Sequence, residues 1–197
     1  MKLNLKESKF KGVNVEKAEN AYNKCILWFF AYSNSRIGLN ELSNLINSSK
    51  TTTKNAVKNL INEEFILRDI AGKSWILSAN QKHRYFTTKK IAYHLGNIYE
   101  VGIVEAVHKI LPQARAIILF GSYRWGSDTE NSDIDIAAEV IGNTGLEIAC
   151  LGNVERLGYR KNIRVNLHVF SRNKIDLNLF ANISNGVVLD GFLEVRP

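Results

Sequence analysis

Residues 116–140, AIILFGSYRWGSDTENSDIDIAAEV, decide how the C-terminal half of this 197-residue chain is interpreted. The first five residues of this stretch are all apolar, which is typical of a strand buried on both faces. Gly121 and Ser122 follow directly, and after ten further residues Asp133 and Asp135 open a second expected strand. Because side chains alternate along a strand, the two aspartates share one face, and the isoleucines between and after them point to the core.

Two carboxylates on one strand face, beside a Gly-Ser turn, have a defined chemical use. They can hold Mg²⁺ ions that bridge the phosphates of a nucleoside triphosphate. Gly121 lets backbone N–H groups and the Ser122 hydroxyl approach those phosphates, because it has no side chain. Two metal ions roughly 4 Å apart would then stabilise the attacking and leaving oxygens of an in-line displacement.

The spacing of these groups resembles the nucleotidyltransferase superfamily of DNA polymerase β, and within it the minimal nucleotidyltransferases. The resemblance runs from about residue 98 to 192 and includes the motifs FGSYRWG and NSDIDI. The closing segment FANISNGVVLDG is similar to the last helix and strand of the family. The resemblance implies that Gly121 and Ser122 bind the triphosphate and that Asp133 and Asp135 bind metal.

The family pattern has a third carboxylate on a later strand, and this sequence departs from it. The matching strand is expected over residues 164–170, where the third position falls on Asn166. Asparagine offers a carbonyl oxygen to a metal but takes no proton, so the site loses a charge and its general base together. His168 shares that strand face, where it serves either as base or ligand or as a structural side chain. Arg124, just past the Gly-Ser turn, lies either on a phosphate or on the surface.

Two further segments of the C-terminal half are expected to be helical. Apolar residues at three- and four-residue steps predict a helix over residues 86–110, with Gly96 marking a break. This helix would connect the two halves of the chain and begin the second domain. Residues 145–157 are expected to form another helix, whose solvated face carries Glu147 and Glu155.

The sequence of the N-terminal half predicts three helices and a hairpin. Apolar residues recur at helical spacing over residues 18–33, and a short helix is expected over 39–46. Serine and threonine residues at 48–51 can cap the next helix, whose buried stripe lies within residues 56–61. Two strands follow over residues 65–77, with a turn around a glycine.

This order of elements resembles the winged helix-turn-helix DNA-binding domains of bacterial and archaeal transcriptional regulators, over roughly residues 16–80. The resemblance implies that the third helix enters the major groove of double-stranded DNA and that the hairpin tip lies against the phosphate backbone. Winged helices also serve as protein-docking modules, so that alternative stays open. The residues expected to contact DNA are Lys50, Thr51, Thr52, Thr53, Lys54, Asn55, Lys58 and Lys73.

Positive charge is concentrated in the N-terminal half. The formal net charge is +7, and residues 1–110 carry 17 Lys and Arg against 9 Asp and Glu, whereas residues 111–197 carry 9 against 10. A basic partner surface therefore belongs to the N-terminal half. The alternative is that basic residues near the N-terminus, such as Lys2 and Lys6, only keep the protein soluble.

The composition is that of a globular protein, with 45% hydrophobic and 23% charged residues. Cys25 and Cys150 lie far apart inside apolar runs, which favours two reduced thiols in a reducing compartment. The N-terminal residues lack the apolar core of a signal peptide, and the longest apolar run is far shorter than the ~20 residues that span a bilayer. We therefore expect a cytoplasmic protein without a membrane partner.

We expect an α+β chain with a winged helix-turn-helix at 16–80, a helical connector at 81–97 and a nucleotidyltransferase-like domain, a mixed sheet flanked by helices, at 98–197. One hypothesis is an enzyme that transfers a nucleotidyl group to a hydroxyl on a protein, small molecule or nucleic acid. The other is a DNA-binding regulator whose second domain senses a nucleotide without turning it over, or only dimerises. We favour a regulator with a nucleotidyltransferase fold, in which Asn166 impairs transfer. By analogy with regulators that read two half-sites, we expect a homodimer.

Overall fold

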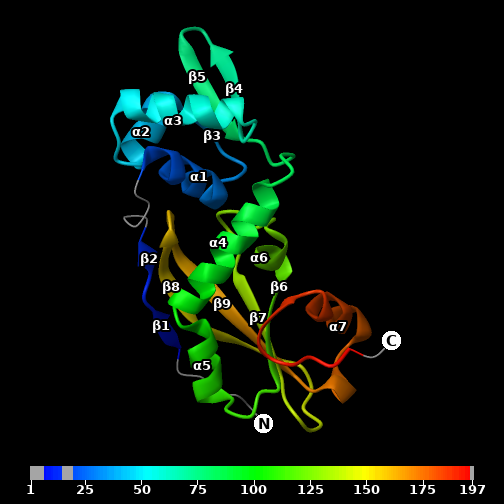
Figure 1. The fold of residues 1–197 in the computed structure, drawn as a ribbon. Coiled ribbons are helices and arrows are strands. Elements are labelled where there is room, and N and C mark those ends of the chain that lie inside the picture. Colours follow the sequence, from blue (N-terminus) through cyan, green and yellow to red (C-terminus); the bar gives the residue numbers. More distant parts are fainter. Residues whose placement is uncertain (1–6, 15–19, 196–197) are drawn as a thin grey trace.

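The computed structural model describes residues 7–14 and 20–195, which form two lobes (Figure 1). The N-terminal lobe holds three helices and a small sheet, and the C-terminal lobe is built on a larger sheet. Residue 16, where the first domain was predicted to begin, lies outside the described residues, as do Lys2, Lys6 and residues 196–197.

The N-terminal lobe has the predicted helices and hairpin in the predicted order, with one short strand added. Its elements are α1 (Ala21–Ala31), β3 (Arg36–Gly38), α2 (Leu39–Leu45), α3 (Lys50–Asn62), β4 (Ile66–Ala71) and β5 (Ser74–Ala79). The three strands pair in the order β3-β5-β4. Ser49 caps α3, because its hydroxyl accepts a hydrogen bond from the Thr52 N–H at 3.1 Å. The rings of Phe30, Phe65 and Phe86 pack together in the core, with centroids 5.2 to 6.1 Å apart.

The C-terminal lobe is built on a seven-stranded mixed sheet. Its strands are β1 (Ser8–Phe10), β2 (Val13–Asn14), β6 (Ala116–Phe120), β7 (Ile134–Glu139), β8 (Glu147–Gly158), β9 (Arg160–Phe170) and β10 (Val187–Gly191). The order is β1-β8-β9-β7-β6-β10, and β2 also pairs with β8. β7 pairs with β9 in parallel, as β1 and β2 do with β8, and the other pairs are antiparallel.

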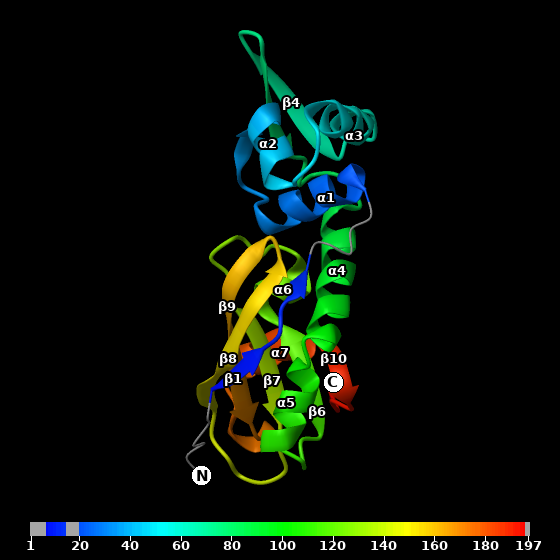
Figure 2. The same cartoon turned by 90° about the vertical axis from the view of Figure 1, so that its left-hand side faces the viewer.

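Helices cover both faces of this sheet (Figures 1 and 2). They are α4 (Phe86–Glu100), α5 (Ile103–Ile110), α6 (Gly121–Trp125), the 3₁₀ turn η2 (Arg172–Lys174) and α7 (Leu177–Ser184). On one face, Ile98 of α4 and Val107 of α5 share a core with Ile136 of β7. On the other face, Ile183 of α7 packs in a smaller core with Phe120 of β6. The expected mixed sheet flanked by helices is therefore present.

Two expected helices differ in the structure. Residues 147–158 form strand β8, so the helix predicted over 145–157 is wrong. β8 is paired along both edges, with β9 on one side and β1 on the other, and this tertiary pairing overrides the local helical pattern. The helical segment over 86–110 is broken at Gly102, which is left-handed with a φ of 79°, and not at Gly96.

The N-terminal segment, considered as a basic tail in the sequence, adds strands to the C-terminal sheet (Figure 2). Phe10 of β1 joins the core of the C-terminal lobe. A Cβ at Gly152 would lie 1.8 Å from the Ser8 carbonyl oxygen, so glycine permits the close approach of β1 to β8. The chain therefore contributes to the C-terminal lobe before it enters the N-terminal one.

Helix α4 joins the two lobes. Phe86, its first residue, packs in the N-terminal core, and Ile98 packs in the C-terminal core. The Tyr32 hydroxyl adds a second link, because it donates to the Tyr159 carbonyl oxygen at 3.2 Å. Within the described part of the chain, no helix combines the length and apolar character needed to cross a bilayer.

Candidate active site

The side chains of Asp133, Asp135 and Asn166 converge on one face of the large sheet. Asp135 of β7 lies opposite Asn166 of β9 in the parallel register, and Asp133 immediately precedes β7. The Asn166 amide nitrogen donates to Asp133 Oδ2 at 3.3 Å and to Asp135 Oδ1 at 3.1 Å. Ile134 and Ile136 are fully buried in the core on the opposite face. The fold thus brings the two predicted carboxylates together with the residue predicted at the third position.

Gly121 brings the backbone directly against this cluster. It follows β6 and opens α6 in a left-handed conformation, with a φ of 71°. A Cβ at this position would lie 2.8 Å from Asp135 Oδ2. Glycine is therefore needed here both for its backbone conformation and for space. Ser122, the next residue, is half-buried in the first turn of α6.

Asp133 and Asp135 bring two carboxylates close together on one face of the sheet. Among the residues that the structure describes, no Lys or Arg forms an ion pair with Asp133 or Asp135. The same residues contain no group of three or more His, Cys, Asp or Glu side chains arranged to hold a metal ion. Mg²⁺ is usually held by one or two carboxylates together with substrate phosphates. Two carboxylates, with an amide and a hydroxyl nearby, fit one such ion and offer fewer protein oxygens to a second.

The amide of Asn166 is held with its nitrogen toward the aspartates. Arg164 Nε donates to Asn166 Oδ1 at 2.9 Å, so the amide oxygen faces the guanidinium. The amide would have to rotate and give up this hydrogen bond before its oxygen could approach a metal. This arrangement neutralises part of the repulsion between Asp133 and Asp135 when no cation is bound.

His168 lies beside the cluster without a hydrogen bond to it. Its Nε2 is 3.5 Å from Asp135 Oδ1, and the side chain is 13% exposed. The ring packs edge-on against Phe120, with centroids 4.9 Å apart. Neither buried ring nitrogen of His168 has a hydrogen-bond partner among residues 7–14 and 20–195. An imidazole is therefore placed next to the carboxylates.

Arg124 contacts residues outside the carboxylate pair. Its Nε donates to the Asn185 carbonyl oxygen at 2.6 Å, and its guanidinium lies 4.0 Å from the centroid of the Trp125 ring. These contacts tie α6 to the turn that follows α7. A phosphate contact of Arg124 stays a prediction.

Seven of the eight residues predicted to contact DNA are exposed, and three of them lie close together. Lys50, Lys54 and Lys73 line one cavity of about 230 Å³ with Trp75. The Lys54 ammonium lies 5.3 Å from the Trp75 ring centroid. Thr53 differs from the prediction, because it is fully buried on the inner side of α3 and cannot face a DNA groove. The other exposed residues are Thr51, Thr52, Asn55 and Lys58.

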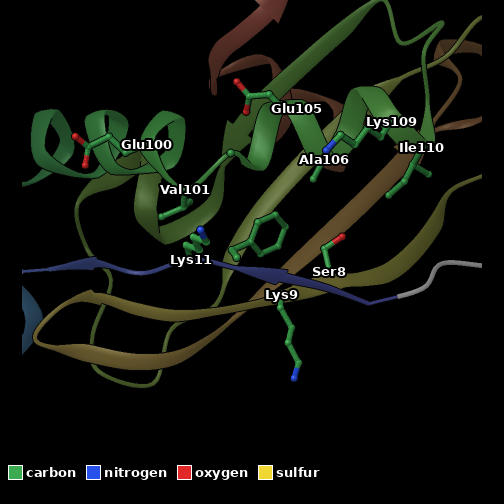
Figure 3. Close-up of a pocket in the computed structure, with 11 residues that line it drawn as sticks. Ser8, Lys9, Lys11, Glu100, Val101, Glu105, Ala106, Lys109 and Ile110 are labelled. Atoms are coloured by element: carbon green, nitrogen blue, oxygen red, sulfur yellow. The ribbon is translucent and has the colours of Figure 1, made fainter.

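A cavity of about 740 Å³ lies elsewhere, between β1 and the junction of α4 with α5 (Figure 3). Phe10 and Val101 contribute apolar surface to it, and Lys109 and Glu105 of α5 also line it. Lys9 points away from this cavity in Figure 3. The carboxylate cluster does not line this cavity. The candidate site is therefore identified by the chemistry of its side chains and not by cavity volume.

The sequence analysis missed a buried charged cluster formed by Lys90, His94, Asp128 and Arg160. All four residues are at most 6% exposed. Burial is the largest influence on the pKa of His94 and lowers it, so the imidazole is neutral at pH 7. A signal was present, since the four-residue step from Phe86 through Lys90 and His94 places both polar residues on the buried stripe of α4.

Comparison with known proteins identifies one part of the chain. Residues 102–189 match the family model described as nucleotidyltransferase domain. The match covers a little under half of the chain and includes Gly121, both aspartates and Asn166, but not the N-terminal lobe. No curated protein and no solved structure matches the chain significantly. The family match supports a nucleotidyl-transfer type of function for residues 102–189.

Proposed function

We propose that the nucleotidyltransferase domain at residues 102–189 binds a nucleoside triphosphate with Mg²⁺ and transfers its nucleotidyl group to a hydroxyl acceptor. The observation that carries this proposal is the meeting of Asp133, Asp135 and Asn166 beside the left-handed Gly121. These two carboxylates form no ion pair with a described Lys or Arg, and the backbone approaches them closely. Such a pair suits a cation that also binds phosphate oxygens.

Each side chain has a separate role in this proposal. Asp133 and Asp135 would hold the magnesium-bound triphosphate, where the metal ion neutralises charge on the phosphate oxygens. The Ser122 hydroxyl and the backbone at Gly121 would bind the triphosphate. The acceptor oxygen then forms a bond to the α-phosphorus, the bond to pyrophosphate breaks, and the acceptor hydroxyl loses its proton. The acceptor is a hydroxyl on a protein, a small molecule or a nucleic acid.

The proton of the acceptor has no carboxylate to receive it at the third position. Asn166 is neutral and cannot act as a base. His168 is the titratable neighbour, with Nε2 3.5 Å from Asp135 Oδ1, and we assign it the role of base or additional ligand. Because both of its ring nitrogens are buried, we expect slow transfer.

Asn166 and Arg164 favour a second candidate function for the same domain. The Arg164–Asn166 hydrogen bond turns a donor toward the aspartates and opposes the metal geometry that catalysis needs. A domain that binds nucleotide but does not turn it over would act as a nucleotide sensor, or as a scaffold for dimerisation.

Calorimetric titration of the purified protein with each nucleoside triphosphate, with and without Mg²⁺, tests the nucleotide site. We expect magnesium-dependent binding of at least one triphosphate, which is lost in the Asp133→Asn/Asp135→Asn double variant. Binding that persists in the double variant would place the nucleotide elsewhere. No binding to any triphosphate in the wild type would reduce the domain to a scaffold.

We also propose that the N-terminal lobe is a winged helix-turn-helix that binds double-stranded DNA, so that the protein is a transcriptional regulator that reads two half-sites as a homodimer. Support comes from the exposed polar side of α3 and from Lys50, Lys54 and Lys73, which share one cavity with Trp75. Lysine side chains that neutralise phosphates release counterions, so their removal weakens binding and flattens its salt dependence.

Duplex binding measured over a range of salt concentrations tests this assignment. Lys50→Ala/Lys54→Ala/Lys58→Ala should weaken binding and reduce the slope of log K against log salt by about 3, at roughly 0.9 per phosphate contact. The matched control is Lys109→Ala/Lys161→Ala/Lys174→Ala, which removes the same charge from exposed positions of the C-terminal lobe. Equal effects of the two triple variants would show that net charge, and not α3, drives binding.

A further inference from the structure

Asp133 depends on a loop for its position. It ends residues 126–133, which connect α6 to β7, and it lies just outside the strand that fixes Asp135. Within this loop the Thr129 N–H donates to Ser132 Oγ at 3.0 Å and makes a tight turn. The geometry of the carboxylate pair is therefore set by whatever holds this loop in place.

Helix α4 holds the loop at Asp128, whose side chain is fully buried. Lys90 Nζ lies 3.1 Å from Asp128 Oδ1 and donates to the Asp128 carbonyl oxygen at 2.5 Å. His94 Nε2 lies 2.9 Å from Asp128 Oδ1. Because a carboxylate oxygen only accepts, the His94 Nε2–H is the donor in this contact. Two residues one turn apart on α4 thus bind both the side chain and the backbone of Asp128.

Arg160 of β9 holds the same loop from the other side. Its guanidinium donates to the carbonyl oxygens of Glu130 at 3.1 Å and Ser132 at 2.5 Å. It also donates to the Tyr123 hydroxyl, and one nitrogen lies 3.9 Å from Asp128 Oδ2. The Tyr123 ring in turn packs on His94, with centroids 4.4 Å apart. The loop is therefore held at positions 128, 130 and 132, and Asp133 follows directly.

Such a cluster is a poor way to gain stability alone. Buried ions lose their hydration, and apolar side chains of similar volume often stabilise a protein as well or better. A buried polar network fixes one geometry where its members have defined partners, and each of these four side chains has at least one. Three of their atoms, His94 Nδ1, Asp128 Oδ2 and Arg160 Nε, have no hydrogen-bond partner in the described part of the chain. Here the network connects α4, the loop and β9 at the point where the chain turns toward the carboxylate pair.

We propose that Lys90 and His94 are positioning residues that act through Asp128 to hold loop 126–133, and with it Asp133, in the geometry that binds a metal-bound nucleotide. The expected effect on nucleotide affinity rests on the proposed function of the domain. The effect on the loop does not, since it follows from contacts within the chain.

Amide hydrogen exchange of the full chain without ligand tests the effect on the loop. His94→Leu removes the donor to Asp128 at similar volume, and His94→Gln retains a donor at nearly the same reach. We expect faster exchange confined to residues 126–133 in His94→Leu and in Lys90→Met, with recovery in His94→Gln. Arg172→Met is the matched control, because it breaks the contact with buried Glu139 at the far end of β7.

The same variants, titrated with the triphosphate that the wild type binds, show whether the position of the loop affects magnesium-dependent nucleotide binding. The Mg²⁺ concentration for half-maximal nucleotide binding should rise about tenfold in His94→Leu, as for other residues that orient metal ligands, and stay unchanged in Arg172→Met. Loop exchange that is unaltered, or equally altered across the whole C-terminal lobe, would overturn the proposal. If exchange responds as expected but the wild type binds no triphosphate, the loop-holding role stands and the proposed function fails.

Discussion

The two ends of strand β7 both carry acidic side chains, but the charge of the neighbouring side chains differs between them. At its start, Asp133 and Asp135 face the neutral amide of Asn166. At its end, Glu139 is 2% exposed and receives a hydrogen bond from Arg172 Nε at 3.1 Å. Arg172 also pairs with Glu194 at 3.0 Å.

This difference separates a structural acid from a candidate ligand. A buried carboxylate with its own guanidinium has its charge compensated within the fold. Two adjacent carboxylates without Lys or Arg partners among the described residues repel each other, and a bound cation would relieve that repulsion. The side chains next to each acidic group of β7 therefore indicate that its start, and not its end, is suited to binding a cation.

The largest effect is expected from adding a charge at the start of β7, called the open end here, where Asn166 of β9 faces Asp133 and Asp135. Asn166→Asp supplies a third carboxylate that both binds metal and accepts a proton, and general base catalysis contributes about 10²- to 10⁴-fold to rate. Pyrophosphate release in the presence of a suitable acceptor measures this gain. Asn153→Asp, the same change at an exposed position of the neighbouring strand β8, is the control and should have no effect. A fully active wild type that gains nothing from Asn166→Asp would show that residue 166 is not the third position.

A smaller effect is expected from displacing one carboxylate by a single methyl group. Gly121→Ala places a Cβ 2.8 Å from Asp135 Oδ2 at a left-handed residue. Gly72→Ala is the matched control, because Gly72 is left-handed too (φ 60°) but has open space where the Cβ would lie. Both should lose about 1–2 kcal/mol of unfolding free energy from backbone strain. Only Gly121→Ala should also weaken magnesium-dependent nucleotide binding in calorimetry, and equal binding in both variants would remove Gly121 from the site.

The open end of β7 could be predicted because its signals are local. The apolar strand, the Gly-Ser turn and the alternating aspartates all lie within residues 116–136, and strand periodicity alone places both carboxylates on one face. Asn166 is distant in sequence, and only the resemblance to the nucleotidyltransferase family placed it at the third position beside the aspartates.

The rest could not be predicted, because it depends on contacts between distant residues. β8 has a local pattern compatible with a helix, and only its pairing with β1 and β9 makes it a strand. Lys90 finds its buried partner Asp128 38 residues further along the chain, and no local pattern indicates that pairing. Thr53 is different, because it lies three and four residues before Ala56 and Val57 on the buried stripe of α3, so helical spacing alone could have predicted its burial. Tertiary pairing decided the first two of these cases.

The last prediction makes the same chemical change at both ends of β7. Glu139→Gln leaves the partly exposed Arg172 with Glu194 alone, so it should cost about 2 kcal/mol of unfolding free energy, between the values for surface and buried pairs. Asp135→Asn removes a charge that has no Lys or Arg partner among the described residues, so unfolding free energy should change by only about 0.5 kcal/mol. Denaturant unfolding measures the change in unfolding free energy of both variants. Calorimetry measures nucleotide binding, and only Asp135→Asn should abolish its magnesium-dependent part. A stability loss in Asp135→Asn as large as that in Glu139→Gln would mean that both ends of the strand are structural.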